Sequence, residues 1–448
     1  MKMRLRWFTL RPSRWLPMFF PLSLAWLLMP AVAGAEGPLA LEDAVRLALA
    51  HNERALKAPL RVKAAEGQLM RARAAFLPTL SAGGSGTLSS NEDRSGQRLS
   101  GNGALTLTQP LLNLSAIPLY SQSRHQLESE RWGAMQDKRL VAFDTARAFL
   151  VVLTSERVLE AATRRYERAR ANQQNSEARA QAQIASTNDV TRAIVETAAA
   201  AREVAQAQGG VARAYLSLGF LVGQPVPGPL AAPDRTTQAA ESAGAGIEEM
   251  ARTAEERRPD IRAAQERTAA LKQAAREPLF RLAPELTASG QGRLITSAVA
   301  PEPFYSGTLQ LNLSWEIYDA GARYGDRRTR LAQAESQALD ERMLRRSVAT
   351  DVGLALASLA AARDSYRSTD DAVTAAQRNT TETELLYKQG LARAIELIDA
   401  NSKRFEAEVN RATAKLAMEQ AYLELRFALG VGPVDDDLEG AAPRGGTP

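Results

Sequence analysis

The chain has 448 residues, a formal net charge of +5, no cysteine and two histidines. The absence of cysteine excludes disulfides, and two histidines give little material for a transition-metal site. Residues 1–35 hold five of the positive charges and no acid, so the rest of the chain, at +5 minus 5, is neutral. It therefore has no basic excess for binding nucleic acid.

Residues 1–35 have the pattern of a secretory signal peptide. Lys2 and four arginines form a positive region, residues 15–29 are apolar, and Ala33-Gly34-Ala35 is a small-residue cleavage motif. The alternative is an uncleaved membrane anchor, which two prolines within a run of about 15 apolar residues disfavour. We therefore expect cleavage after Ala35 and export of the remaining chain.

Two similar halves follow, each with a short helix, two strands, a very long helix and a returning helix. In the first half these elements are predicted at 53–76, near 79–90, around Leu105 and Leu107, after Pro118, and at 187–222. In the second half they are predicted at 259–282, 286–296, 306–315, 322–389 and 394–429. Polar loops at 91–101 and 297–305 separate the strands of each pair.

The two halves are a duplication. Leu41-Glu42-Asp43-Ala44 matches Ile247-Glu248-Glu249-Met250 at an offset of 206 residues, and Tyr215 to Phe220 matches Tyr422 to Phe427 at 207. A repeat of this length indicates a duplicated structural unit. We predict a first repeat at 36–222, a linker rich in proline and glycine at 223–246, a second repeat at 247–430, and a tail at 431–448.

A coiled-coil seam is the longest periodic signal. Apolar or small residues recur at alternating spacings of four and three from Val348 to Ala376, and the positions 207 residues earlier, Val141 to Ala169, repeat the pattern. A period of 3.5 residues is typical of a coiled coil. At 1.5 Å per residue, a helix of about 65 residues is roughly 100 Å long, which is too long for the core of a compact domain.

The four alternating strands predict part of a membrane β-barrel. After residue 35 no run of 18 apolar residues remains, so the chain could cross a membrane only as a barrel. For any single strand the alternative is an amphipathic hairpin on a soluble domain. Four strands cannot close a barrel, so their edges would require other copies of the chain. Two copies would give eight strands and three would give 12.

Four short segments stand out by their order, spacing and duplication. They are Leu41-Glu42-Asp43-Ala44-Val45, Arg258-Pro259-Asp260-Ile261, Trp315-Glu316-Ile317-Tyr318-Asp319-Ala320-Gly321 and Tyr387-Lys388-Gln389-Gly390. With them the chain resembles the TolC family of outer-membrane efflux proteins over about residues 39–433. The resemblance implies a mainly α-helical fold with a small β part, in which long coiled-coil helices form a periplasmic barrel. It also implies a homotrimer with a 12-stranded barrel in outer-membrane lipid.

The resemblance further implies a passive exit duct of a tripartite efflux pump or a type I secretion system. Its partners would be a periplasmic adaptor protein and an inner-membrane transporter. The sequence contains no phosphate-binding loop, nucleophile motif or metal-ligand cluster, so we expect no enzyme activity, cofactor or metal site. The transported substrate and the choice between efflux and protein secretion stay open.

The candidate gate lies around the turn between the last two helices. Glu396 and Asp399 are three residues apart, so both carboxylates fall on one helix face. The resemblance implies that this acidic pair faces the channel axis, where three chains would form a cation-favouring ring of six carboxylates. The resemblance aligns Tyr387 with the family's gating tyrosine. It puts the partner arginine at Ala392, one residue before Arg393, which leaves the partner of Tyr387 open.

The equivalent turn of the first repeat carries different charged residues. Asp189 corresponds to Glu396, whereas Arg192 stands at the position of Asp399. Without the resemblance, Glu396 and Asp399 read as a surface pair near a helix N-terminus, where the helix dipole stabilises carboxylates. We therefore expect the gate where the two repeats differ.

A second functional interpretation is a periplasmic coiled-coil adaptor or scaffold without a pore. It would explain the signal peptide, the seam and the lack of active-site motifs. It would not explain four alternating strands placed symmetrically in the two halves. We therefore favour the duct.

Overall fold

The computed structural model describes residues 38–88, 90, 98–242, 246–295 and 304–434. The predicted signal peptide, most of the two strand-connecting loops and residues 435–448 of the tail lie outside the described residues. Within the described ranges, no helix combines the length and the apolar composition that a membrane crossing requires.

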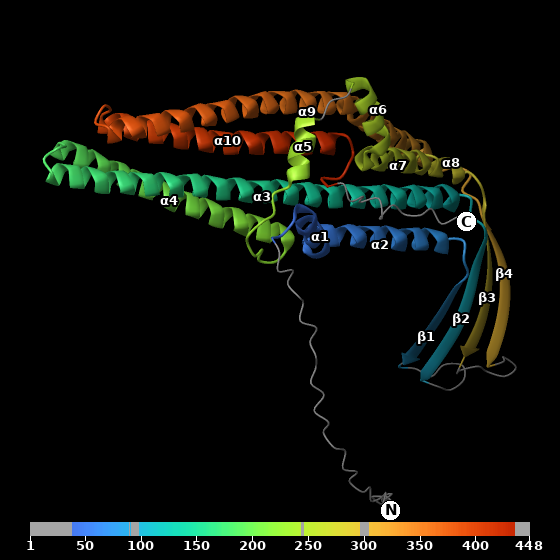
Figure 1. The fold of residues 1–448 in the computed structure, drawn as a ribbon. Coiled ribbons are helices and arrows are strands. Elements are labelled where there is room, and N and C mark those ends of the chain that lie inside the picture. Colours follow the sequence, from blue (N-terminus) through green and yellow to red (C-terminus); the bar gives the residue numbers. More distant parts are fainter. Residues whose placement is uncertain (1–37, 89, 91–97, 243–245, 296–303, 435–448) are drawn as a thin grey trace, which may run out of the picture. The chain divides into compact units, whose positions relative to one another are not determined.

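Four long helices dominate the chain and confirm the predicted helix lengths (Figure 1). They are α3 (Ala116–Gln181), α4 (Thr187–Val222), α9 (Ala322–Lys388) and α10 (Ala394–Ala428). α3 has 66 residues and α9 has 67, so each is roughly 100 Å long. α4 and α10 both pack against α3, and α10 also packs against α9. Among these four helices, α4 and α9 therefore form the two flanks.

Shorter helices complete the layer. They are α1 (Leu41–His51), α2 (Glu53–Ala74), α5 (Asp234–Ser242), α6 (Ile247–Arg257), α7 (Pro259–Ala274) and α8 (Glu277–Phe280). α2 and α4 both pack on α3, as α7 and α10 pack on α9, so each long helix lies beside two shorter ones, as predicted. The helix predicted at 259–282 is interrupted between α7 and α8, because Pro278 in the first turn of α8 cannot donate a helical hydrogen bond to Ala274 at the end of α7. The segment predicted as a linker contains α5.

One antiparallel sheet joins the two halves. Its strands, in spatial order, are β1 (Thr79–Leu88), β2 (Leu99–Leu112), β3 (Glu285–Ile295) and β4 (Tyr305–Ser314). β2 of the first half pairs with β3 of the second, with a register irregularity between Pro110 and Leu112. β1 and β4 are therefore the edges of the sheet, and every residue in both is exposed. All four predicted strands are present.

One face of the sheet is apolar and the other is polar. According to the register, the first face carries Leu80, Ala82, Leu105, Leu107, Ala288, Leu294, Tyr305, Leu309, Leu311 and Leu313, with glycines between them. The opposite face carries Ala104 and Ile295 and otherwise mainly polar side chains, namely Thr79, Ser81, Ser85, Thr106, Thr108, Thr287, Gln291, Arg293, Thr308, Gln310 and Asn312. Successive side chains of a strand point to opposite faces, so the alternation of apolar and polar residues in the sequence places the two kinds on opposite faces of the sheet.

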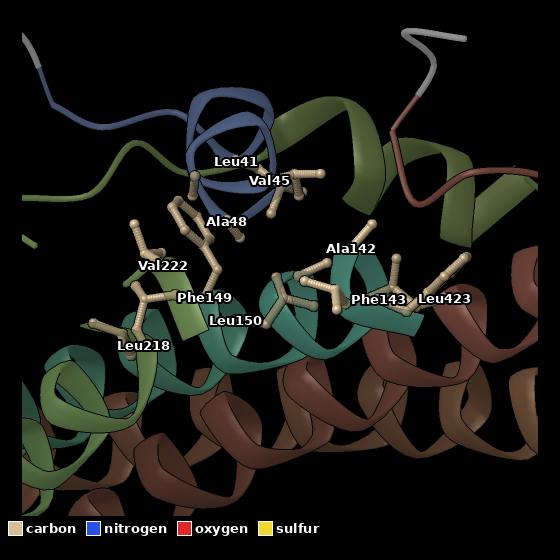
Figure 2. Packing of buried hydrophobic residues seen from close by; sticks show 14 of the residues in the cluster. Leu41, Val45, Ala48, Ala142, Phe143, Phe149, Leu150, Leu218, Val222 and Leu423 are labelled. Atoms are coloured by element: carbon tan, nitrogen blue, oxygen red, sulfur yellow. The ribbon is translucent and has the colours of Figure 1, made fainter. Parts of the chain in front are cut away.

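Two apolar cores attach the long helices to the shorter ones. In the first, Leu41 of α1 belongs to one cluster with Phe149 of α3 and Leu218 of α4 (Figure 2). In the second, Val352 of α9 belongs to one cluster with Met418 of α10. Each predicted seam position, from Val348 to Ala376 and from Val141 to Ala169, is buried or half-buried. The predicted seam is therefore confirmed.

Candidate gate at the helical tips

Two tight turns join the long helices to their returning helices. α3 passes to α4 through residues 182–186, and α9 passes to α10 through residues 389–393. The first turn contains Gln183 at φ 60° and the second contains Gly390 at φ 80°, positions related by the 207-residue offset of the repeat. Glycine adopts this left-handed conformation freely, whereas glutamine pays roughly 1–2 kcal/mol. The turns share a backbone conformation, and the first one is strained.

Tyr387 is buried where α9 ends. Its side chain is 5% exposed and packs with Ala394 and Leu397 of α10. Its hydroxyl oxygen lies 3.4 Å from Oγ of Ser176, which belongs to α3. Tyr387 therefore contacts both hairpins, α3–α4 and α9–α10, close to their tips.

Arg179 of α3 is the cation that contacts Tyr387. Its Nη1 donates a 3.1 Å hydrogen bond to the Tyr387 carbonyl, and its guanidinium carbon lies 4.9 Å from the ring centroid. Arg393 instead donates from Nε to Glu396 at 3.1 Å, and it is exposed. The sequence pattern pointed to Arg393 and gave no direct indication of Arg179. The repeat held a signal, because adding 207 to 179 gives 386, so Arg179 and Tyr387 fall at similar heights on equivalent helices.

The predicted acidic residues lie in the first two turns of the returning helices. Glu396 accepts the backbone N–H of Arg393 at 3.3 Å as well as its side-chain bond, and the N-terminus of α10 stabilises this carboxylate. Asp399 is exposed one turn later. In α4, Asp189 is half-buried and Arg192 is exposed. Because Glu396 already has a cationic partner within its own chain, Asp399 is the stronger candidate for the negative charge of a ring.

Buried ion pairs hold α3 against α4 within the first hairpin, above the tips. Arg165 of α3, with a side chain 7% exposed, lies 2.9 Å from Glu196 of α4 and also binds Glu203. Its guanidinium carbon lies 5.0 Å from the ring centroid of Phe405 in α10. Removing one partner of a buried ion pair costs about 3–5 kcal/mol. The ion pairs therefore stabilise the first hairpin, and Arg165 reaches the second hairpin through Phe405 and a 3.3 Å hydrogen bond to Ser402 of α10.

The arrangement offers charge and hydrogen bonds at a helix junction. Within the part of the chain that the structure describes, no group of three or more histidine, cysteine or acidic side chains could hold a metal ion. The residues gathered at the tip are therefore suited to holding two hairpins together and to repelling or attracting a passing ion.

Comparison with known proteins identifies the fold and the family. The model of the outer membrane efflux protein family matches the chain twice, over residues 44–224 and 250–431. The chain belongs to this family. The resemblance drawn from the sequence is thereby confirmed, as is the location in the outer membrane with an extension into the periplasm. As an outer membrane efflux protein, the chain serves efflux as a duct.

Solved structures of channels share the fold. VceC of Vibrio cholerae matches at 16% identity and a TM-score of 0.73, over 88% of this chain and 97% of that chain. The open state of the MtrE channel of Neisseria gonorrhoeae matches at 20% identity and 0.73, over 88% and 89%. The CmeC channel of Campylobacter jejuni matches at 14% identity and 0.74, over 87% and 85%. No curated protein sequence matches significantly.

Proposed function

We propose that three copies of this chain assemble into a passive outer-membrane exit duct whose periplasmic mouth is gated by the helical tips. The observation that carries the proposal is the open sheet with one apolar and one polar face. In lipid, unpaired edge groups of β1 and β4 would cost several kcal/mol each, so the edges require partners. Pairing β1 of one copy with β4 of the next supplies them.

The polar face favours three copies over two. An eight-stranded barrel has an interior filled by side chains, whereas 12 strands leave room for a lumen. Side chains such as Gln291, Arg293 and Gln310 are suited to a water-filled lumen, and the leucines opposite them are suited to lipid. Four strands from each of three chains give the 12 strands expected from the sequence.

The flanks of the helical layer carry matching apolar surfaces. On one flank, Leu60 of α2 is 59% exposed and Leu216 of α4 is 75% exposed. On the other, Leu339 and Met343 of α9 are each 57% exposed. A head-to-tail contact between these flanks would close into a ring. It would extend the helical layer in the same direction as the pairing of β1 with β4.

At the tip, we propose that Tyr387, Arg179 and Ser176 hold the hairpins closed while Glu396 and Asp399 set the charge of the entrance. The duct would be passive, with energy supplied by an inner-membrane transporter and a periplasmic adaptor bridging the two. Either a tripartite efflux pump or a type I secretion system fits this arrangement. The family match favours the duct over the adaptor interpretation.

The assembly is tested by measuring the mass of the detergent-purified protein and its conductance in a planar bilayer. We expect a mass of three chains and a pore. Leu216→Glu places a charge on the flank and should reduce the trimer and the pore together, whereas Leu216→Met keeps the surface apolar and should not. A purified monomer that forms no pore would favour the adaptor interpretation.

The gate charge is tested with the double variant Glu396→Gln and Asp399→Asn. We expect higher single-channel conductance or weaker block by divalent cations. Glu406→Gln, an exposed change further along α10, is the matched control. Conductance and block equal to those of the unmodified channel would remove both residues from the constriction.

A further inference from the structure

A basic cavity lies between the two hairpins, away from the tip residues. It has a volume of about 510 Å³ and is lined by α3, α9 and α10. Since α3 belongs to one hairpin and α9 and α10 to the other, whatever occupies the cavity touches both. The cationic side chains lining it are Arg157, Arg164, Arg404, Arg411 and Lys415.

The lining acids are engaged by more than one arginine each. Glu408, with a side chain 8% exposed, accepts from Arg164 at 3.1 Å and from Arg404 at 2.9 Å. Glu160 accepts from Arg164 at 2.7 Å and from Arg157 at 3.1 Å. Two carboxylates are thus shared among three guanidinium groups. The cavity wall therefore keeps a positive excess after these pairs form.

Two further acids reduce this excess without removing it. Asp370 binds Arg411, and Glu419 lies 3.7 Å from Lys415. Counting these two and Glu384, whose charge acts on Arg168, with the lining acids gives five carboxylates against five lining cations and the adjacent Arg168, six in total. One positive charge is left in excess at this place.

Arg168 supplies buried donors next to the cavity. It follows Arg164 by one helical turn on α3, and its Nε and Nη2 atoms are buried with no hydrogen-bond partner among the described residues. Burial lowers the pKa of Arg168, and the neighbouring charges of Arg404 and Arg164 act in the same direction. A buried donor left unpaired costs about 1–3 kcal/mol. The cavity wall thus has unmatched charge, and unmatched donors lie directly behind it.

We propose that this cavity binds a small oligoanion, with several phosphate or carboxylate oxygens, between α3 and α10. Guanidinium groups hold such oxygens through pairs of parallel hydrogen bonds. An anion that accepts from Arg168 and Arg164 on α3 and from Arg404 on α10 links the two hairpins. Its binding would oppose their separation and favour the state in which Tyr387 contacts Arg179, a consequence that rests on the proposed gate.

Binding is tested by calorimetric titration of pyrophosphate into the full-length protein at constant ionic strength in chloride. We expect saturable binding that Arg168→Gln and Arg404→Gln each weaken by about tenfold or more, the equivalent of one charge-assisted hydrogen bond. Arg170→Gln is the control, because Arg170 is exposed on the opposite side of α3. Absence of saturable binding, or equal loss in the Arg170 variant, would overturn the site. Thermal unfolding confirms that each variant is folded.

The link to gating is tested separately in a planar bilayer. Pyrophosphate on the side of the helical tips should lower the open probability of the unmodified channel several-fold and leave the Arg168→Gln channel unchanged. Binding without any effect on open probability would overturn the link and retain the site. Saturable binding by a protein that forms no pore would contradict the proposed duct and leave the anion site standing.

Discussion

Arg179→Ala should open the channel, because it removes the cation that joins α3 to Tyr387. The hydrogen bond to the Tyr387 carbonyl, 3.1 Å long, involves a charged donor and contributes about 1.5–3 kcal/mol. The contact with the ring, 4.9 Å from guanidinium carbon to centroid, adds about 0.5–1 kcal/mol at a half-exposed site. The carbonyl keeps the Gly390 N–H at 3.1 Å, so it is not left unpaired.

At the lower end of both ranges the net loss is about 2 kcal/mol per chain, or roughly 30-fold in the closed-to-open ratio. If three tips open together, the losses add to about 6 kcal/mol, on the order of 10⁴-fold. Open probability in a planar bilayer measures this shift, and Arg170→Ala provides a control for the loss of a charge from α3. Tyr387→Phe should act less, about fivefold, since its hydroxyl contact with Ser176 is long at 3.4 Å.

A channel carrying Arg179→Ala that stays closed as often as the unmodified channel would refute this reasoning. The same would follow if Arg170→Ala opened it equally, because general charge loss would then explain the effect. A thermal unfolding curve distinguishes opening from unfolding. Since the buried contacts of Arg165 remain in the variant, the midpoint should move little.

Three further predictions concern stability and use thermal or chemical unfolding. Gln183→Gly should stabilise the first tip by about 0.5–1 kcal/mol, because glycine relieves the left-handed backbone strain. Gly390→Ala should destabilise the second tip by about 1 kcal/mol. If both variants changed stability in the same direction, the turns would differ from the described backbone. Phe149→Ala should cost about 3–5 kcal/mol, because the ring is fully buried between α1, α3 and α4, and a loss below 1 kcal/mol would contradict that packing. The hydrogen bond from Arg323 lowers the pKa of Asp319. The ionised Asp319 therefore contributes its full stability above 3.8, the pKa in the unfolded chain, and loses it as the pH falls below that value. In Asp319→Asn, the stability should fall less steeply with decreasing pH in this acid range.

Local patterns predicted most of the fold. The 3.5-residue period predicted the bounds of α3 and α9 to within a few residues, because the buried positions of a helix recur with the period of its turns. Alternation identified all four strands for the same reason. The prediction was less accurate where one residue overrides the pattern, as Pro278 does between α7 and α8. It missed α5, whose nine residues lie in a segment rich in proline and glycine.

The candidate site was predicted only in part. Tyr387, Glu396 and Asp399 were identified through the resemblance, and their roles in gating stay predictions. Arg179 was missed because it lies 208 residues from Tyr387 and no local pattern connects them. The basic cavity was missed for a similar reason, since arginines on a helix surface read as solvated until a second helix covers them.

By itself the sequence determined the duplication, the lengths of the helices, the two faces of each strand and the family of the chain. The first three follow from periodicities of two, 3.5 and about 207 residues, which are properties of neighbouring or equivalent positions. The family follows from the resemblance of four short segments. Only the tertiary structure decided that Arg179, not Arg393, holds Tyr387, and that arginines of α3 and α10 enclose one cavity. Those contacts join residues far apart in the chain, and they exist only because α3 packs against α10 and ends beside α9.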